Sequence, residues 1–286
     1  MSALAHTLLE LEPPAQPSLT PALRELYDSD LAFPKRGSRP YVIANFVSTL
    51  DGVASFMIPG QSSGGTVSGC DPTDRFIMGL LRASVDAVIV GANTVQDVNP
   101  DDLWIPEFTY PEAKQLYAEY RRALGKPQYP LVVVVSGKMR VDLKRAVFRR
   151  PDVPTVLITA GAGETALLKG GASEMPWPHT RRLPGDLNGF VSPATILNLL
   201  HSEFQVGTLL HEGGPTLLGQ FLRADQVDEL FLTVAPQVAG RLPQSNRPGV
   251  VQGVEFSPPQ APWWQLLSIK QARNHLYLRY RRKTGA

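Results

Sequence analysis

The residues with the clearest capacity for chemistry stand in one stretch, Leu209-Leu210-His211-Glu212-Gly213-Gly214-Pro215-Thr216-Leu217-Leu218. Its pattern predicts a buried strand, a glycine pair and then a helix. The first backbone N–H groups of a helix have no partner inside the helix and attract anions. Gly213 and Gly214 leave room for a phosphate, and Thr216 can donate a hydrogen bond. We therefore predict a nucleotide phosphate site here. Glu212, at the strand end, is either a functional carboxylate or a structural residue that caps the helix or orders the Gly213 turn.

Three other predicted strands end in polar or small residues. The residues of interest at these ends are Asn45, Asp51, Gly91, Thr94 and Ser136. In open α/β sheets, ligands bind beyond the carboxyl ends of parallel strands. We therefore expect these positions to line one cleft with the Glu212–Thr216 stretch. Asp51-Gly52 is also a typical turn pair, so Asp51 has a structural alternative.

A second glycine motif competes with this assignment. Gly161-Ala162-Gly163-Glu164-Thr165-Ala166 follows a predicted strand and fits the dinucleotide fingerprint G-x-G-x-x-G/A. The helix that it would open is stopped by Gly170-Gly171, and Asp186, at about the distance where a Rossmann fold has an acid, lies in loop-like sequence. We expect a strand-to-helix turn that contacts the cofactor, and not a Rossmann unit.

Hydrophobic periodicity predicts an α/β fold around these positions, with a mixed and mostly parallel central sheet flanked by helices. The expected helices are 74–84, 111–124, 193–200 and 217–224, and loops are expected at 60–69 and 170–189. The expected strands are 41–48, 87–90, 131–136, 155–159, 208–211 and 228–235. An antiparallel hairpin of 265–271 and 276–282, turning at Arg273-Asn274, is expected to end the sheet.

The chain is expected to form one domain with two additions. Residues 1–38 are rich in proline and polar residues and predict an N-terminal extension that covers the core or a partner subunit. Residues 39–286 form the predicted domain, and a helical insertion is expected at about 101–128. The aromatic residues of this insertion are expected to pack in the core.

Composition narrows the classes of function. A net charge of +2 over 286 residues gives no strong field for nucleic acid or acidic lipid, and no apolar run reaches the length of a membrane span. A single cysteine excludes a disulfide framework, and the five histidines have no metal-binding spacing, so we expect no metal. The N-terminus lacks the pattern of a signal peptide. These features predict a cytoplasmic protein.

Six motifs occur in order between residues 39 and 282. They are Arg39-Pro40-Tyr41-Val42, Thr49-Leu50-Asp51-Gly52, Leu81-Arg82-Ala83, Val90-Gly91-Ala92-Asn93-Thr94-Val95, Glu212-Gly213-Gly214-Pro215-Thr216-Leu217 and Asp228-Glu229-Leu230. Together they resemble the reductase domain of riboflavin biosynthesis, which has the dihydrofolate-reductase-like fold. The zinc deaminase domain that accompanies many bacterial members needs an H-x-E and P-C-x-x-C signature, which this sequence lacks. The resemblance is therefore to a stand-alone reductase.

The resemblance implies an NADPH-dependent reductase that acts on a ribosylamino-pyrimidine 5′-phosphate and converts its ribose to ribityl. It also implies a homodimer. The cofactor-binding positions carried over are Asn45, Gly91, Thr94, Ser136, Gly213, Gly214, Pro215 and Thr216. The resemblance makes Arg82 and Glu212 substrate-binding residues: the Arg82 guanidinium suits the substrate phosphate, and Glu212 faces the substrate beside the nicotinamide. Glu212 and Asp51 are the candidate catalytic acids, with water as the alternative proton donor.

Two departures from the family bear on the substrate. Val98 stands where family members commonly have an aspartate that holds the cofactor, and Asp97 lies one residue earlier. The 101–128 segment also replaces a stretch that supplies substrate contacts in the family. Two alternatives therefore stay open. One is the same fold reducing a pterin, dihydrofolate or another carbonyl or imine, and the other is a non-catalytic nucleotide-binding protein.

Overall fold

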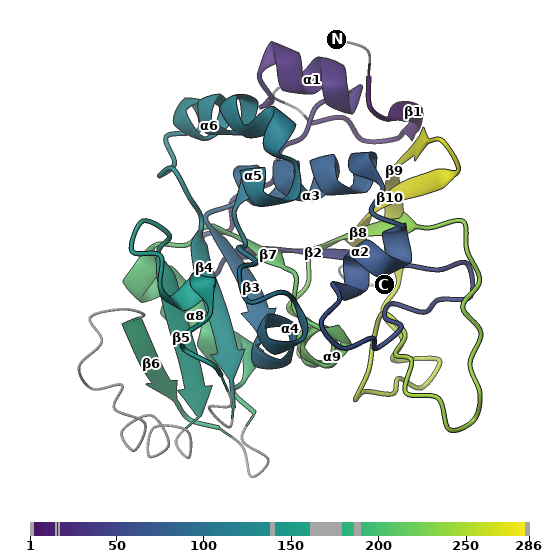
Figure 1. Cartoon of the computed structure of the whole chain (residues 1–286). Helices are drawn as coiled ribbons and strands as arrows, with labels where there is room; N and C mark the ends of the chain where they lie inside the picture. Colours follow the sequence, from purple (N-terminus) through teal and green to yellow (C-terminus); the bar gives the residue numbers. More distant parts are fainter. Residues whose placement is uncertain are drawn as a thin grey trace.

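A ten-stranded mixed sheet organises the chain, in the order β1-β9-β10-β8-β2-β7-β3-β4-β5-β6. The structure is a computed structural model that describes residues 3–14, 16, 18–137, 141–160, 179–185 and 190–283. Helices cover both faces of the sheet (Figure 1). This architecture confirms the predicted α/β class and the mostly parallel sheet.

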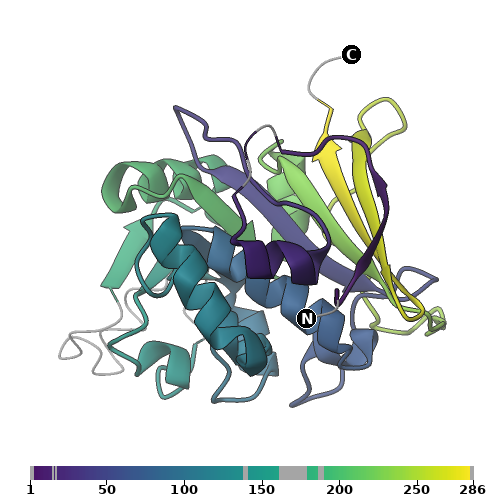
Figure 2. The same ribbon diagram turned by 90° about the horizontal axis from the view of Figure 1, so that it is seen from above.

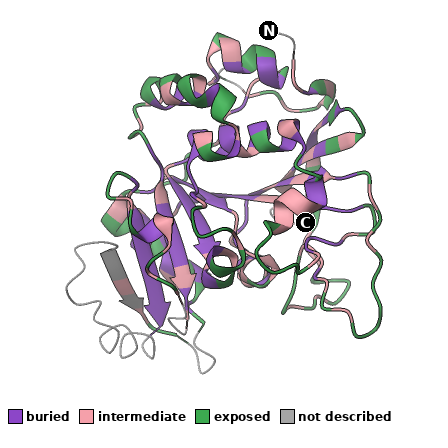
Figure 3. Ribbon diagram, viewed as in Figure 1, coloured by how far each residue is buried: buried purple, intermediate pink, exposed green. Residues whose placement is uncertain are grey.

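The parallel part of the sheet contains every parallel strand that the sequence predicts. Its strands are β2 (Tyr41–Ser48), β3 (Ala87–Gly91), β4 (Leu131–Ser136), β5 (Thr155–Ala160), β6 (His179–Leu183), β7 (Thr208–His211) and β8 (Glu229–Val234). The central strands are buried on both faces, as expected for parallel strands between two helical layers (Figure 3). The prediction of a loop over 170–189 was wrong at β6. Among the described strands, β6 is a polar strand at the edge of the sheet, where it is held by backbone hydrogen bonds to β5 alone. Its sequence therefore lacks the hydrophobic periodicity from which strands are predicted.

The antiparallel end of the sheet is the predicted hairpin. β9 (Trp264–Ala272) and β10 (His275–Arg282) pair antiparallel, and β10 also pairs antiparallel with β8. Arg273 takes the left-handed conformation, with φ of 51°, in the turn between the two strands. The predicted turn at Arg273-Asn274 is confirmed.

Residues near the N-terminus belong to the same sheet and core. β1 (His6–Glu10) pairs antiparallel with β9 at the edge of the sheet, and α1 (Pro21–Tyr27) lies over the neighbouring helices (Figure 2). Leu23, Leu26 and Leu31 are buried in the main core. The part of the chain that the sequence separates as an extension thus completes the edge of the sheet and one apolar layer. The division at residue 38 stays a prediction.

Two helical layers sandwich the sheet. On one face lie α1, α3 (Pro72–Ser84), α5 (Pro106–Thr109), a 3₁₀ turn at Pro111–Ala113 and α6 (Lys114–Ala123). On the other face lie α8 (Pro193–Phe204) and α9 (Pro215–Arg223). Two short helices, α2 (Ser63–Ser68) and α4 (Ala92–Asp97), stand near the carboxyl ends of the parallel strands. The loop predicted at 60–69 was wrong over α2, where the Ser62 hydroxyl accepts a bond from the Gly65 N–H and so caps a helix with few apolar residues.

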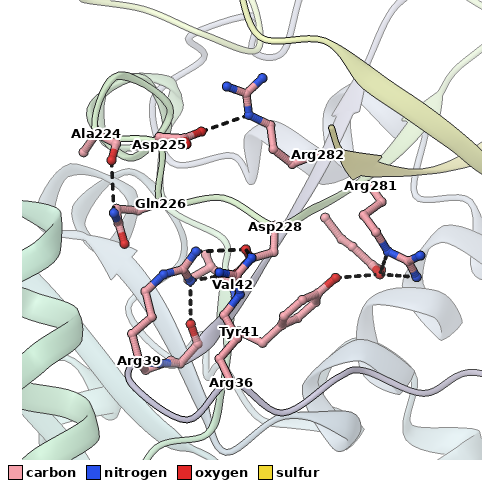
Figure 4. A network of polar contacts seen from close by, with 12 residues as sticks. Arg36, Arg39, Tyr41, Val42, Ala224, Asp225, Gln226, Asp228, Arg281 and Arg282 are labelled. Carbon is pink, nitrogen blue, oxygen red and sulfur yellow. Dashed lines mark hydrogen bonds and ion pairs between the residues drawn. The ribbon is translucent and has the colours of Figure 1, made fainter. Parts of the chain in front are cut away.

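The amino ends of β2 and β8 are held by a charged network (Figure 4). The Asp228 carboxylate accepts bonds from Arg39 Nη1 and Nη2 at 2.8 and 2.9 Å and from the Val42 N–H at 2.8 Å, and it pairs with Arg36 at 2.6 Å. Asp228 is almost fully buried, so these partners offset the cost of removing its charge from water. Two of the motifs that carry the family resemblance therefore serve the fold, at the end of the strands away from the proposed cleft.

Candidate active site

The strand register brings Asn45 and Glu212 together. Ala44 pairs with His211 across the parallel β2–β7 ladder, so the next residues along both strands, Asn45 and Glu212, are neighbours. The Glu212 N–H bonds to the Ile89 carbonyl at 3.0 Å and continues the pairing with β3. Because side chains alternate along a strand, the amide and the carboxylate point to the same face of the sheet, the face covered by α3. Two predicted site residues thus form one polar surface.

Arg82 and Glu212 form a buried ion pair. Arg82 Nη2 and Nε lie 2.7 and 3.0 Å from Glu212 Oε2, and both side chains are more than nine-tenths buried. The Nη1 group of Arg82 donates to the carbonyl oxygens of Leu103 and Ile105, at 3.2 and 3.3 Å. The structure therefore joins the two predicted substrate-binding residues to each other, and it leaves the guanidinium little surface for a phosphate.

Thr94 and Gly214 face each other between two helix starts. A Cβ atom added to Gly214 would lie 3.4 Å from Thr94 Oγ1 and would meet no other atom that close. Gly91 and Gly214 are the N-cap residues of α4 and α9, and neither helix start has a side-chain cap. Figure 1 shows both helices beyond the arrowhead of β3. Uncapped N–H groups, a hydroxyl and open space together fit the phosphates of a dinucleotide.

Gly213 and Gly214 have different surroundings. A Cβ at Gly213 would lie 2.7 Å from Leu217 Cδ2 and 3.1 Å from His211 Cε1. A side chain at Gly213 would therefore crowd Leu217 and His211, whereas Gly214 borders the open side. The sequence predicts a phosphate-binding role for both residues and does not distinguish them.

His211 lies under this turn on the opposite face of the sheet from Glu212. Its ring packs between Phe46 and Phe221, with centroid distances of 6.1 and 5.0 Å, and is fully buried. Neither ring nitrogen has a hydrogen-bond partner within the described part of the chain. Burial lowers the pKa of His211 to about 4, so the ring is neutral at physiological pH.

Asp51 organises a loop at the end of β2. Its carboxylate accepts bonds from the Thr49 hydroxyl at 2.6 Å and from the N–H groups of Ala239 and Gly240 at 3.0 and 2.8 Å. The Thr49 bond, followed by the Ala239 bond, holds the pKa of Asp51 well below its usual range. A carboxyl in this state is a poor proton donor near neutral pH. The geometry favours the turn-forming role for Asp51, and its catalytic role stays a prediction.

The remaining predicted cofactor positions lie in the first turn of α9 and at the end of β4. Thr216 is exposed in the first turn of α9, and the segment 249–253 passes beside it, where Gln252 N–H donates to the Pro215 carbonyl at 3.1 Å. Ser136 ends β4 and is buried, with its backbone in the ladder opposite Thr159. The prediction for Gly161–Ala166 lies outside the described residues.

Arg145 is a residue that the sequence did not identify. Its Nη1 and Nη2 groups donate to the carbonyl oxygens of Val98 and Gln96, at 2.9 and 2.6 Å, at the carboxyl end of α4. Val98 packs against the core, and Asp97 is exposed to solvent. Arg145 thus holds the end of the helix that carries Thr94. No local pattern connects residues almost fifty positions apart, so only the structure reveals this contact.

Among the described residues, no group of three or more His, Cys, Asp or Glu side chains could hold a metal ion. Across the same ranges, none of the helices combines the length and the apolar character needed to cross a bilayer.

Known proteins share this architecture and sequence pattern. A crystallised pyrimidine reductase-like protein from Corynebacterium diphtheriae superposes with a TM-score of 0.65 at 20% identity, covering 86% of this chain and 93% of that chain. The 2,5-diamino-6-ribosylamino-4(3H)-pyrimidinone 5′-phosphate reductase of Archaeoglobus fulgidus is 30% identical over 221 residues, which is 76% of this chain and 89% of the relative. The similarity to the first confirms the expected fold, and the similarity to the second covers nearly the whole relative.

A longer relative matches over part of its length. The riboflavin biosynthesis protein RibD of Aquifex aeolicus is 27% identical over 206 residues, or 71% of this chain, which spans about half (48%) of that relative. Residues 40–278 match the family described as RibD C-terminal domain. With the sheet order, the Asn45–Glu212 neighbours and the paired helix starts in place, this match over most of the sequence shows that the chain belongs to the RibD C-terminal domain family.

Proposed function

We propose that this protein is an NADPH-dependent reductase of a ribosylamino-pyrimidine 5′-phosphate. The observation that carries the proposal is the proximity of two features at the carboxyl ends of the parallel strands. Thr94 and Gly214 face each other between two uncapped helix starts, and Asn45 lies beside Glu212 one strand away. The first feature suits cofactor phosphates, and the second suits a polar substrate. The name of the Archaeoglobus fulgidus relative supports the substrate class.

The residues of the cleft fit a division of tasks. Thr94, Thr216 and the first N–H groups of α9 would hold the phosphates of a nicotinamide cofactor, which supplies hydride when bound. The open-chain substrate has a C1=N bond, so hydride goes to C1 and a proton to the nitrogen. Asn45 and Glu212 orient the substrate by hydrogen bonds. Because Glu212 is paired with Arg82, we assign the proton to water and the orienting role to the carboxylate.

One observation favours a second candidate function. The carbonyl groups of Leu103 and Ile105 contact Arg82, so the 101–128 segment, which departs from the family pattern, reaches the substrate side of the cleft. The alternative is the same fold reducing a pterin, dihydrofolate or another imine or carbonyl compound. A non-catalytic NADP-binding protein is the third possibility.

Turnover by the purified protein separates these functions. NADPH oxidation is followed with 2,5-diamino-6-ribosylamino-4(3H)-pyrimidinone 5′-phosphate, dihydropterin and dihydrofolate as substrates. We expect turnover with the first compound and growth of a riboflavin-requiring strain that lacks its reductase. Turnover of a pterin or dihydrofolate alone would establish the second function, and NADPH binding with no turnover of any compound would establish the third.

Cofactor choice, assembly and location complete the proposal. We infer NADPH in preference to NADH, a homodimer and a cytoplasmic location, all of which rest on the family resemblance. Titration with both cofactors and light scattering of the purified protein test the first two inferences. Equal affinity for NADH, or a monomer at the concentration of the activity assay, would contradict them.

A further inference from the structure

We propose that the 101–128 segment positions Glu212 for substrate by holding Arg82, and that Arg121 is the residue of the segment that fixes the Arg82 backbone. The catalytic consequence rests on the proposed function, whereas the structural coupling between the segment and Glu212 does not. Arg82 is then a positioning residue that acts through Glu212, and not a ligand of the substrate phosphate.

The first contact joins the segment to the Arg82 side chain. The guanidinium presents its Nε and Nη2 edge to Glu212 and its Nη1 group to the carbonyl oxygens of Leu103 and Ile105. Arg82 is 5% exposed, so these partners replace water around its charge. The carbonyls of the segment therefore determine which way the guanidinium faces, and the guanidinium holds the carboxylate.

The second contact joins the segment to the Arg82 backbone. Arg121, on α6, is 2% exposed, and its Nη1 group lies 3.3, 3.1 and 2.8 Å from the carbonyl oxygens of Arg82, Ala83 and Val85. The last carbonyls of a helix have no partner inside the helix, and a positive charge there also suits the helix dipole. Arg121 Nε donates to the Pro127 carbonyl at 2.7 Å. One guanidinium thus links the end of α3 to the end of the segment.

Burial of Arg121 has a cost that this role explains. Burial lowers the pKa of its guanidinium to about 10, which leaves the group charged at neutral pH. Its Nη2 atom is buried with no hydrogen-bond partner within the described part of the chain. An incompletely paired buried charge is unfavourable, and an apolar side chain would fill the same space without that cost. The three carbonyl contacts of the guanidinium at the end of α3 offset this cost.

A third contact lets the segment lie directly on α3. A Cβ added to Gly79 would lie 2.7 Å from Tyr117 Oη and 2.8 Å from the Pro106 carbonyl oxygen. Tyr117 is buried, and its hydroxyl donates to the Phe76 carbonyl at 2.8 Å. Figure 1 shows α6 on the side of α3 away from the sheet, and α5 beside α3. The segment thus contacts α3 at Gly79, at the Arg82 side chain and at the carboxyl end of the helix.

The test compares Arg121→Met with Arg122→Met, the exposed neighbour on the same helix. Hydrogen exchange of residues 101–110 and 209–217 is measured without ligand, and kcat and KM are measured with 2,5-diamino-6-ribosylamino-4(3H)-pyrimidinone 5′-phosphate. For Arg121→Met we expect faster exchange in both segments, a fall in kcat/KM of about tenfold or more, and NADPH affinity within about twofold of the parent protein. Arg121→Lys, which retains a donor, should recover part of the loss, and Arg122→Met should change neither quantity.

A folded Arg121→Met protein with parental exchange at 209–217 would overturn the proposal, even if its unfolding midpoint is lower. If Arg121→Met does not fold, Gly79→Ala serves instead, because it displaces Tyr117 and Pro106 while keeping every charge. Faster exchange at 209–217 in Gly79→Ala would then support the proposal, and parental exchange there would overturn it. Absence of turnover in the parent protein would refute the proposed function alone, since the exchange comparison needs no substrate.

Discussion

Residues adjacent in the sequence have different tasks at the end of β7. His211 fills the apolar layer under α9, Glu212 faces α3 on the other side of the sheet, and Gly213 packs against Leu217. Gly214 alone borders the open space beside Thr94. His211 and Glu212 point to opposite faces because side chains alternate along a strand. The glycine at 213 reflects the close approach of α9.

Thr94→Val tests the cofactor site directly. The substitution keeps the shape of the side chain and removes the hydroxyl, so we expect NADPH binding to weaken by about 1 kcal/mol, or roughly fivefold. Fluorescence titration with NADPH measures the effect, and Asn93→Ala, exposed on the same helix, is the control. Equal affinity of Thr94→Val and the parent protein would remove Thr94 from the site.

The two glycines should respond in opposite ways to alanine. Gly213→Ala places a methyl group 2.7 Å from Leu217, and we expect a loss of about 1–3 kcal/mol in the free energy of unfolding. Gly214→Ala meets only Thr94 Oγ1 at 3.4 Å, so the fold should be retained while NADPH affinity falls. Urea unfolding and NADPH titration of both variants measure the two effects. Loss of stability in Gly214→Ala with unchanged affinity would show that this glycine is only a turn residue.

His211 should make stability depend on pH. Its pKa in the folded protein is about 4, below the ordinary value of 6.5. Between these two pH values the histidine binds a proton in the unfolded chain and not in the folded chain. The free energy of unfolding should therefore fall as pH drops from about 6.5 to 4, by up to about 3 kcal/mol. Burial raises the pKa of Asp74 to about 6, so the folded chain binds the additional proton there. Asp74 therefore raises the free energy of unfolding as pH falls through about 6.

Comparison with His211→Phe isolates the contribution of the histidine to the pH dependence of stability, because Asp74 is the same in both proteins. Phenylalanine suits the site between Phe46 and Phe221. Urea unfolding at several pH values should show that the difference between the two proteins grows as pH falls through this window. Parallel pH profiles would show that His211 does not carry the effect.

At the scale of elements, α9 and the segment 249–253 are held in close contact. A Cβ on Gly219 would lie 2.2 Å from the backbone oxygen of Gln252, and the Arg223 side chain donates to the Gly253 carbonyl at 2.9 Å. This segment connects α9 to the loop that Asp51 holds. Helix α9 and the loop at the end of β2 are therefore linked through this segment.

Gly219→Ala tests this contact. A backbone oxygen cannot move away by a side-chain rotation, so we expect the free energy of unfolding to fall by about 2 kcal/mol despite the higher helix propensity of alanine. Gln220→Ala, one position further along the helix, should stay within about 0.5 kcal/mol of the parent protein. Urea unfolding compares the two. Equal stability of both variants would mean that the segment shifts without cost.

For the whole molecule, the N-terminal residues complete the sheet and the main core. Removal of residues 1–38 takes away β1, α1 and the buried Leu23, Leu26 and Leu31. Each fully buried leucine contributes about 1.5–3 kcal/mol, so we expect a loss of at least about 4 kcal/mol, a large part of the stability of a typical domain.

The truncated protein should therefore be largely unfolded or should bind a hydrophobic dye, which circular dichroism and dye fluorescence will show. Leu8→Ser, at an exposed position of β1, is the control and should unfold as the parent protein does. A folded, fully active truncated protein would support the separate extension that the sequence predicts.

The sequence by itself determined the elements and the positions where the parallel strands end. Runs such as Val132-Val133-Val134, the hairpin at Arg273-Asn274 and the glycine pair at 213–214 each depend on residues close together in the chain, so local periodicity reveals them. The strands β6 and β1 and the helix α2 lack that periodicity and were not predicted.

Only the tertiary structure decided how the site residues meet. Arg82 and Glu212 are 130 residues apart, and their pairing depends on the order of the strands and on the path of α3 above them. The same order sets Asn45 beside Glu212 and Thr94 beside Gly214. Contacts across a sheet arise from the packing of whole elements, and a local pattern carries no information about which elements become neighbours. For this reason the sequence indicated the candidate residues, and the fold determined which of them become neighbours.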